Sequence, residues 1–251
     1  MATQYPEAFA RFYDLMYQQL RDSVDHEFFL EQIKQTGGKI LEVGVGTGRF
    51  FLDALNWGAD IYGLDISESM LDVLKSKLKP EQSDRISIQN IIDFKYDCQF
   101  DLIIAPFRVM MHLMEKEDQV AALNNVYDHL NSGGRFIFDT FVPDLKQLIS
   151  GIKNLTDFKA EYEPGKQLRR TVTTIPELIK QVINVTFDLE WEEDEGLKQE
   201  TWSTQLRFFF RYELEHLIER SLFGEYEILG DYAGNALTEG SKEFIAVCRK
   251  S

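Results

Sequence analysis

An acid and three glycines in residues 40–50 carry the clearest chemical signal of this sequence. Glu42 is followed by Gly44, Gly46 and Gly48 at alternate positions, after an apolar run and before a stretch with helical spacing. Glycine permits positive φ angles and has no Cβ, so a ligand can approach the backbone closely. The pattern therefore predicts a strand, a tight turn and a helix entrance that together hold a nucleotide-like cofactor.

The spacing of the glycines indicates which cofactor this is. A dinucleotide fingerprint reads G-x-G-x-x-G and places a pyrophosphate on a helix N-terminus, whereas this loop reads G-x-G-x-G with an acid two residues before it. Glu42 would repel a phosphate but attract a sulfonium and an ammonium, and S-adenosylmethionine carries both. The loop resembles the first motif of class I S-adenosylmethionine-dependent methyltransferases. A purely structural strand–turn–helix corner is the alternative, because a short glycine motif alone is a weak signal.

A second acid, Asp65, ends the next expected strand at residues 60–64. In a doubly wound sheet, ligands lie across the carboxyl ends of adjacent strands. Asp65 can therefore accept hydrogen bonds from both ribose hydroxyls, and Ile66 can pack on the adenine. The alternative role of Asp65 is to cap the helix expected at 67–78, although Ser67 can serve as that cap. An acid at this position also occurs in nicotinamide enzymes, so it indicates a nucleoside without choosing among them.

The resemblance implies an adenine contact in residues 89–94. This stretch reads Q-N-I-I-D-F and is similar to the family's G-D-M-x-D-F. The similarity places Asn90 where the family has an acid, and Ile91 where a backbone amide binds the ring. An asparagine oxygen can still accept a hydrogen bond from the adenine amine. Asp93 is the alternative if the alignment shifts.

Residues 100–113 resemble the family's F-D-L-I-x-A-x-F segment, followed by a loop that ends in His-Leu. The resemblance implies that this strand ends, at Ala105, beside the methyl-bearing sulfur. Methyl transfer is an in-line displacement, so an enzyme contributes mainly alignment and exclusion of water. His112 has a pKa suited to a base near neutrality, and a histidine of a similar G-H-L segment faces the substrate amine in sugar amine N-methyltransferases. The alternative is that His112 caps or packs the following helix.

Two tyrosines, Tyr13 and Tyr17, form a Y-D-x-x-Y element that resembles one found before the first motif in many small-molecule methyltransferases. A tyrosine over the cleft can shield the sulfonium and hydrogen-bond the methionine carboxylate. The competing explanation is an apolar stripe on a helical segment, residues 1–35, that docks on the sheet. Arg49 is expected to remain solvated, with a carboxylate contact as the secondary alternative. Three further residues are expected to line the cleft: Phe107, Arg108 and Met111.

An alternation of strands and helices is needed to position these residues. From 39 to 141, short apolar runs alternate with amphipathic stretches, which predicts βαβ units and a parallel sheet. Pro80 and the N-S-G-G run at 131–134 are expected to end two of the helices. The expected strands are 39–43, 60–64, 85–89, 100–105 and 134–141, and the expected helices are 48–57, 67–78 and 117–130.

After Pro143 the sequence changes to period-two stretches rich in β-branched and aromatic residues. They predict antiparallel strands at 168–175, 180–192 and 198–210, with a solvated hairpin turn at 192–196. Substrate choice is expected in this insertion, although most of its aromatic residues should form a small core of its own. The chain is expected to end with a helix at 211–222, with His216 on its surface, and strands at 225–230 and 243–249, the last of them reversed and closing the sheet.

The expected fold class is therefore α/β, a doubly wound seven-stranded Rossmann-like methyltransferase sheet with an antiparallel β insertion before the last helix. A chain of 251 residues can bury one such core with an elaboration. We expect an N-terminal helical cap at 1–35, an S-adenosylmethionine-binding domain at 36–145 and 211–251, and a lid and substrate region at 146–210.

The composition limits the partners. A formal net charge of −15 argues against nucleic-acid binding, which needs clustered Lys and Arg, and favours a small-molecule substrate. No opening stretch resembles a signal peptide and no apolar run reaches about 18 residues, so we expect a cytoplasmic protein without a membrane span. Cys98 and Cys248 lie far apart without a C-x-x-C pattern, which predicts neither a disulfide nor a metal site.

The sequence thus predicts an enzyme that transfers a methyl group from S-adenosylmethionine to a nitrogen or oxygen of a small-molecule acceptor. One alternative is a non-catalytic cofactor-binding protein of the same fold. Another is a nicotinamide-dependent oxidoreductase, which the glycine spacing and Glu42 oppose. The acceptor and the oligomeric state do not follow from the sequence.

Overall fold

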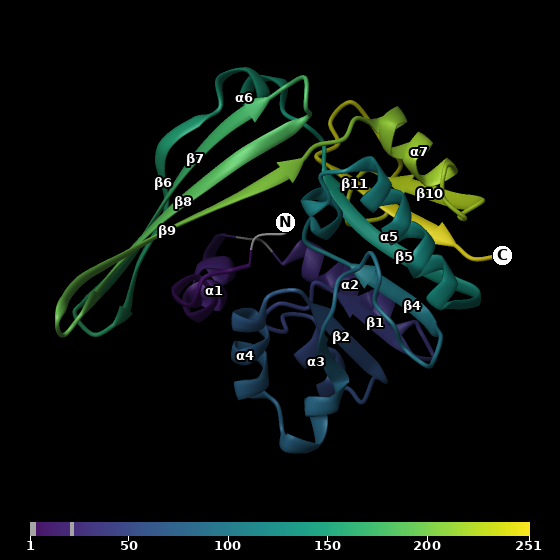
Figure 1. Cartoon of the computed structure of the whole chain (residues 1–251), viewed down its shortest axis with the longest axis horizontal. Helices are drawn as coiled ribbons and strands as arrows, with labels where there is room; N and C mark the ends of the chain where they lie inside the picture. The colour runs from purple at the N-terminus through teal and green to yellow at the C-terminus, as the bar shows by residue number, and fades with distance from the viewer. Residues whose placement is uncertain (1–3, 21–22) are drawn as a thin grey trace.

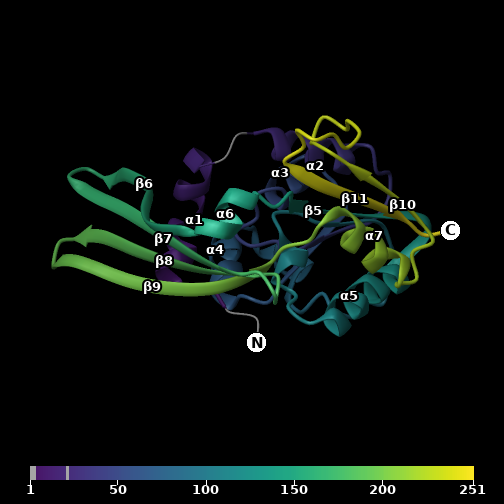
Figure 2. The same cartoon turned by 90° about the horizontal axis from the view of Figure 1, so that it is seen from above.

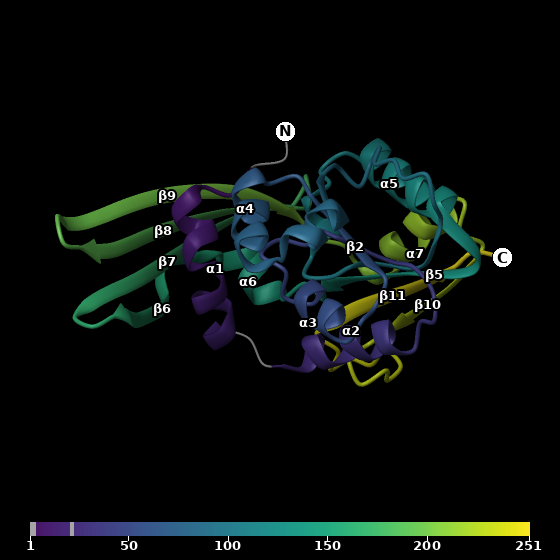
Figure 3. The ribbon, with the colours of Figure 1, turned by 90° about the horizontal axis from the view of Figure 1, so that it is seen from below.

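The computed structural model describes residues 4–20 and 23–251 and consists of two sheets (Figure 1). A seven-stranded sheet carries helices on both faces, and a separate four-stranded antiparallel sheet extends away from it (Figures 2 and 3). This arrangement confirms the expected doubly wound α/β fold with an antiparallel insertion. No helix in the described ranges is long and apolar enough to cross a membrane.

The large sheet has the strand order β10-β11-β5-β4-β1-β2-β3, in which β11 runs antiparallel to β5. Its order reverses between β1 and β4, which is where ligands bind in open α/β sheets. The last strand is reversed as expected, but β10 and not β11 lies at the edge. The strands are β1 (Ile40–Val43), β2 (Ile61–Asp65), β3 (Ile86–Ile88), β4 (Phe100–Ala105), β5 (Leu130–Phe141), β10 (Glu225–Leu229) and β11 (Glu243–Arg249).

Each face of the large sheet has its own apolar core. Phe29, Ala54 and Leu71, from three helices on one face, pack in one cluster, whereas Leu123 and Leu214 belong to the cluster on the other face. The helices are α2 (Val24–Lys34), α3 (Phe51–Asn56), α4 (Glu68–Lys77), α5 (Lys116–His129) and α7 (Arg211–Glu219), with short 3₁₀ helices η1 (Pro80–Arg85) and η2 (Val109–His112).

Two boundaries differ from the sequence-based expectation because of glycines with positive φ. The helix expected from residue 48 begins only at Phe51, since Gly48 has a φ of +92°, which is incompatible with a helix. The strand expected from residue 134 begins at Leu130, since Gly133, with a φ of +77°, lies in a bulged stretch that pairs with β4.

The inserted sheet has the strand order β6-β7-β8-β9. The sequence analysis missed β6, whose pairing with β7 shifts register at three points and so breaks the period-two pattern. It also missed α6, although Asp144 accepts hydrogen bonds from the Lys146 and Gln147 amides, as a helix N-cap does. These elements are α6 (Leu145–Ser150), β6 (Ile152–Glu163), β7 (Lys166–Glu177), β8 (Val182–Glu193) and β9 (Gly196–Arg207).

The N-terminal helix α1 (Glu7–Leu20) packs between the inserted sheet and α4 (Figure 1). Its Phe9, Phe12 and Met16 are buried in one cluster with Leu189 and Trp202 of the inserted sheet. The apolar stripe thus docks the helix mainly on the inserted sheet, because the strands β6 to β9 present an unpaired apolar face to it.

Candidate active site

A cleft opens at the carboxyl ends of β1, β2 and β4, below α1 and beside β9. Its empty volume, including the part open to solvent, is about 1230 Å³. The predicted site residues that line this cleft are Tyr13, Tyr17, Glu42, Gly44, Gly46, Asp65, Ile66, Asn90, Ile91 and His112.

The three glycines of the loop after β1 have different surroundings. All have positive φ, and Gly44 and Gly46 line the cleft. A Cβ on Gly44 would lie 2.4 Å from Val109 Cγ2 of η2, so this glycine allows η2 to approach the loop. Gly48 lies outside the cleft, and a Cβ there would lie 2.4 Å from Leu74 Cδ1 of α4. Gly48 therefore allows close packing of the loop on α4.

Glu42 brings a buried carboxylate to the cleft. The residue is 1% exposed, and its Oε2 has no hydrogen-bond partner among the described residues. Burial raises the pKa of Glu42 well above its usual value, while the nearby Arg49 and the Phe51 amide act in the opposite direction. A buried acceptor without a donor is costly, so this oxygen fits a ligand that supplies an ammonium group.

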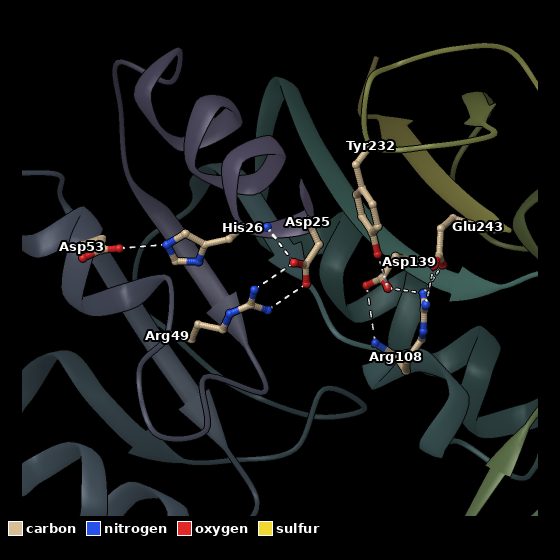
Figure 4. A network of polar contacts seen from close by, with 8 residues as sticks. All are labelled: Asp25, His26, Arg49, Asp53, Arg108, Asp139, Tyr232 and Glu243. Atoms are coloured by element: carbon tan, nitrogen blue, oxygen red, sulfur yellow. Dashed lines mark hydrogen bonds and ion pairs between the residues drawn. The ribbon is translucent and has the colours of Figure 1, made fainter. Parts of the chain in front are cut away.

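Arg49 is held by an ion pair, which shows that the expectation of a solvated side chain was wrong. Its two terminal nitrogens donate to Asp25 of α2 at 2.7 and 2.8 Å (Figure 4). Next to this pair, His26 Nε2 lies 2.9 Å from Asp53 Oδ2 of α3. Both contacts fasten α2 beside the glycine loop. Neither contact follows from a local sequence pattern, because the partners lie 24 and 27 positions apart.

Asp65 joins two parts of the site. The Gly46 amide donates to its Oδ2 at 2.9 Å, and the Ser67 amide donates to its Oδ1 at 2.8 Å. Burial raises the pKa of Asp65, although these amides oppose the shift. The Ser67 side chain makes no capping hydrogen bond at the start of α4, contrary to the expectation, and instead contacts the Ser69 hydroxyl.

The segment after β3 forms a turn closed by its own asparagine. Asn90 Oδ1 accepts a hydrogen bond from the Ile92 amide at 3.2 Å, and the Asn90 carbonyl accepts one from the Phe94 amide at 2.9 Å. Asn90 and Ile91 line the cleft, whereas Asp93 is exposed and lies outside it. Of the two residues proposed for the adenine contact, Asn90 therefore lies at the cleft and Asp93 does not.

The loop after β4 contributes an aromatic ring and a histidine. Ala105 is fully buried inside β4 and does not line the cleft, while Phe107 and His112 do. The expectation that His112 has a pKa suited to a base near neutrality was wrong, because burial lowers its pKa to about 4. Its imidazole is neutral at neutral pH, but it is a weaker base than expected. The expectation that Arg108 and Met111 line the cleft was wrong, since Met111 is buried in the core and Arg108 forms ion pairs away from the cleft.

Two tyrosines of α1 cover the cleft. The rings of Tyr13 and Tyr17 lie 4.4 Å apart, and that of Tyr17 lies edge-on to Phe107 at 5.1 Å. Arg170 of β7 donates to the Tyr17 hydroxyl at 3.3 Å. The tyrosines thus take part both in the cleft wall and in the packing of α1, so the two explanations of the Y-D-x-x-Y element are compatible.

The same helix is attached to the glycine loop. Thr47, which lies between two of the glycines, donates from its hydroxyl to Asp14 Oδ1 at 2.6 Å. Lys77 of α4 pairs with Asp14 and donates to the Thr47 carbonyl at 2.9 Å. These contacts hold α1 over the loop that forms the cleft floor.

The sequence analysis missed the cleft wall that β9 supplies. Thr204 and Gln205 line the cleft, together with Tyr5 and Met114. Arg207 Nε donates to the Met114 carbonyl at 2.7 Å and so joins β9 to the loop after His112. Thr204 and Gln205 continue an ordinary period-two strand pattern, so no sequence signal distinguished them. The more conspicuous Trp191 and Trp202 pack against α1 as core residues, as expected.

Comparison with known proteins shows that the chain is similar in sequence and in fold to methyltransferases. Residues 40–134 match the family model described as a methyltransferase domain. An uncharacterized methyltransferase of Bacillus mycoides is 32% identical over 142 residues, which cover 56% of this chain and 59% of that protein. The chain thus spans less than two thirds of the length of this relative.

Solved structures share the arrangement over nearly the whole chain. A sugar N-methyltransferase from a Streptoalloteichus species has a TM-score of 0.76 at 17% identity, with 100% of this chain and 98% of that one covered. An S-adenosylmethionine-bound amino pentose methyltransferase from Micromonospora echinaspora has a TM-score of 0.71 at 17% identity, with both chains covered in full. At such low identity these likenesses establish the fold.

Proposed function

We propose that this chain, whose residues 40–134 match the methyltransferase-domain family model, is a class I S-adenosylmethionine-dependent methyltransferase that transfers the methyl group to an amine nitrogen of a small molecule. The observation that carries the cofactor assignment is the unpartnered Oε2 of the buried Glu42. A carboxylate in this position suits a cofactor with an ammonium and a sulfonium, and it disfavours one with a pyrophosphate.

The remaining cofactor contacts are assigned by position in the cleft. Asp65 is placed to accept hydrogen bonds from the ribose hydroxyls, and Ile66 to pack on the adenine. Asn90 and the Ile91 amide are placed at the adenine edge, and the backbone of Gly46 underlies the cofactor. When bound, S-adenosylmethionine supplies an electrophilic methyl group.

The charges of the cleft favour an amine over an anionic acceptor. Among the described lining residues, Arg49 is the one arginine or lysine, and it already pairs with Asp25. The wall formed by Phe107, Thr204 and Gln205 carries no charge. A carboxylate or phosphate acceptor would lose its hydration there without gaining a cation, whereas an amine can bind in its neutral form. The relatives of this fold that act on amino sugars make an amino sugar the first acceptor to test.

His112 is the group that can take the proton that the acceptor nitrogen has to lose. Its imidazole is neutral at neutral pH, because burial lowers its pKa to about 4, so an imidazole nitrogen is free to accept. The apolar surroundings that disfavour imidazolium also disfavour an ammonium in the same place. An acceptor amine therefore binds in its neutral form, and His112 can take the proton that the nitrogen must lose once it has accepted the methyl group.

The aromatic wall excludes water from the reacting groups. Tyr13, Tyr17 and Phe107 contact one another edge-on or tilted over the cleft. Enclosure of this kind strengthens the electrostatic interactions inside the site and holds nucleophile and methyl group in line.

A methyl-transfer assay with a panel of acceptors tests this function. We expect formation of S-adenosylhomocysteine with at least one amine, amino sugars included, and none with the matched carboxylates. His112→Gln should lower kcat by about 10²- to 10⁴-fold while binding S-adenosylhomocysteine as the wild type does. Turnover on carboxylates alone would contradict the acceptor assignment. Cofactor binding without turnover on any acceptor would favour the non-catalytic alternative.

A further inference from the structure

Two consecutive residues between β4 and η2 have a left-handed backbone. Phe107 has a φ of +63° and Arg108 a φ of +72°, and neither is a glycine. Side chains with a Cβ rarely adopt this conformation, and a bulky aromatic residue in it is an outlier. Such a backbone persists only where the surrounding structure holds it, and it occurs at sites where geometry matters.

The restraint on this turn is a buried ion cluster on the side away from the cleft. The Arg108 guanidinium pairs with Asp139 at the end of β5 and donates from Nη2 to Glu243 Oε1 of β11 at 2.8 Å (Figure 4). The Arg108 backbone amide also donates to Asp139 Oδ1 at 3.4 Å, and the Tyr232 hydroxyl donates to Asp139 Oδ2 at 3.0 Å. Asp139 is fully buried and the Arg108 side chain is 14% exposed, so water screens these contacts weakly.

The turn sets the position of three groups that face the cofactor cleft. Phe107 projects its ring toward Tyr17. Arg108 is the residue from which η2 starts, and η2 ends at His112. Val109, the first residue of η2, fits against Gly44 where a Cβ would clash. A change of φ at residue 108 would therefore move the aromatic wall, the histidine and the contact with the glycine loop together.

We propose that Arg108 is a positioning residue, whose ion pairs with Asp139 and Glu243 hold the left-handed turn and thereby place Phe107, Val109 and His112 at the cleft. The consequence for methyl transfer rests on the proposed function. The placement itself does not, because it follows from contacts within the chain.

A pair of double variants that differ by one methyl group tests the proposal. Arg108→Ala/Asp139→Asn and Arg108→Gly/Asp139→Asn remove the same two ion pairs, with Asp139 and with Glu243, but only alanine is strained at a positive φ. The readouts are the pKa of His112, from NMR titration of the imidazole signals with His112→Gln for assignment, and the Kd for S-adenosylhomocysteine from calorimetry. Thermal unfolding of each variant reports any general loss of stability.

We expect the alanine variant to raise the His112 pKa by at least about one unit toward 6.5, because the imidazole becomes hydrated when the turn relaxes. It should also weaken S-adenosylhomocysteine binding about tenfold, since Val109 leaves its place against Gly44. The glycine variant should keep both values close to those of the wild type. Arg108→Gln/Asp139→Asn, which removes the ion pairs but keeps a long polar side chain and its Cβ, serves as the milder variant if the alanine variant does not fold.

Alanine and glycine variants that both fold, with an unchanged His112 pKa and unchanged affinity, would overturn the proposal and leave Arg108 a contributor to stability alone. The same result with Arg108→Gln/Asp139→Asn would overturn it if the alanine variant does not fold. A wild-type protein that binds no S-adenosylhomocysteine would instead contradict the proposed function. The comparison of His112 pKa values would still test the turn in that case.

Discussion

The Gly46 amide donates a 2.9 Å hydrogen bond to Asp65 Oδ2, which joins the loop after β1 to the end of β2. The other oxygen of the same carboxylate accepts from the Ser67 amide at the start of α4. Asp65 thus fixes the cofactor loop before any ligand binds. Preorganisation of this kind reduces the ordering that binding has to impose.

Asp65→Ala should weaken the binding of S-adenosylhomocysteine by at least about tenfold, because the loop loses an anchor and the ribose hydroxyls lose an acceptor. Calorimetric titration measures this change. Asp72→Ala, on the exposed surface of α4, is the matched control and should bind as the wild type does. Equal affinities of the two variants would show that Asp65 does not act on the ligand.

Glu42→Gln should weaken S-adenosylhomocysteine binding and stabilise the protein without ligand by about 1 kcal/mol or more at pH 7, because it removes a buried charge. The pKa of Glu42 is raised in the folded state, so its destabilising effect is absent below the unfolded pKa of about 4.5 and grows as pH rises from there toward the folded pKa. Thermal unfolding of both proteins at pH 7 and pH 5 should show the larger difference at pH 7. A lower melting temperature of the variant at pH 7, with unaltered affinity, would contradict the account.

Gly48→Ala should destabilise the protein by about 2–4 kcal/mol, which combines the strain of a positive φ with overpacking against Leu74. Gly58→Ala is the control, because Gly58 has a φ of +82° but no atom within 4 Å of the added Cβ. Its cost should be about 1–2 kcal/mol, from backbone strain alone. Urea unfolding of both variants gives the comparison. Equal losses would mean that Leu74 moves aside without cost.

His112 should make the protein less stable in acid. Its folded pKa is about 4 against 6.5 in the unfolded chain, so the unfolded state binds the extra proton between these values and stability rises with pH across that window. From pH 7 to pH 5 this group alone should cost about 2 kcal/mol. Denaturant unfolding of wild type and His112→Gln isolates the contribution. Parallel losses of stability in both proteins would show that His112 is hydrated.

The parts of the site that sequence predicted are those formed by neighbours in the chain. The position of Glu42 before Gly44 and the position of Asp65 at a strand end follow from local pattern, and the fold brings both to one cleft. The same holds for the strands and helices of the large sheet, whose alternation is a local signal. Strand β6 was not predicted, because the bulges in its pairing with β7 interrupt the two-residue period that identifies a strand.

Contacts between distant segments account for what could not be predicted. Arg108 meets Glu243 across 135 positions, and Arg170 meets Tyr17 across 153. Thr204 reaches the cleft only because β9 is joined to the loop after η2. None of these contacts could be predicted from a local sequence pattern. The positions of these side chains are determined by tertiary packing alone.

The central claim is that the cleft binds S-adenosylmethionine through an acid where other nucleotide sites bind phosphate. Isothermal titration calorimetry of the wild-type protein with S-adenosylhomocysteine, and separately with NADH, tests it most directly. We predict saturable binding of S-adenosylhomocysteine at one site per chain and no heat with NADH. Binding of NADH, or no binding of S-adenosylhomocysteine, would contradict the claim.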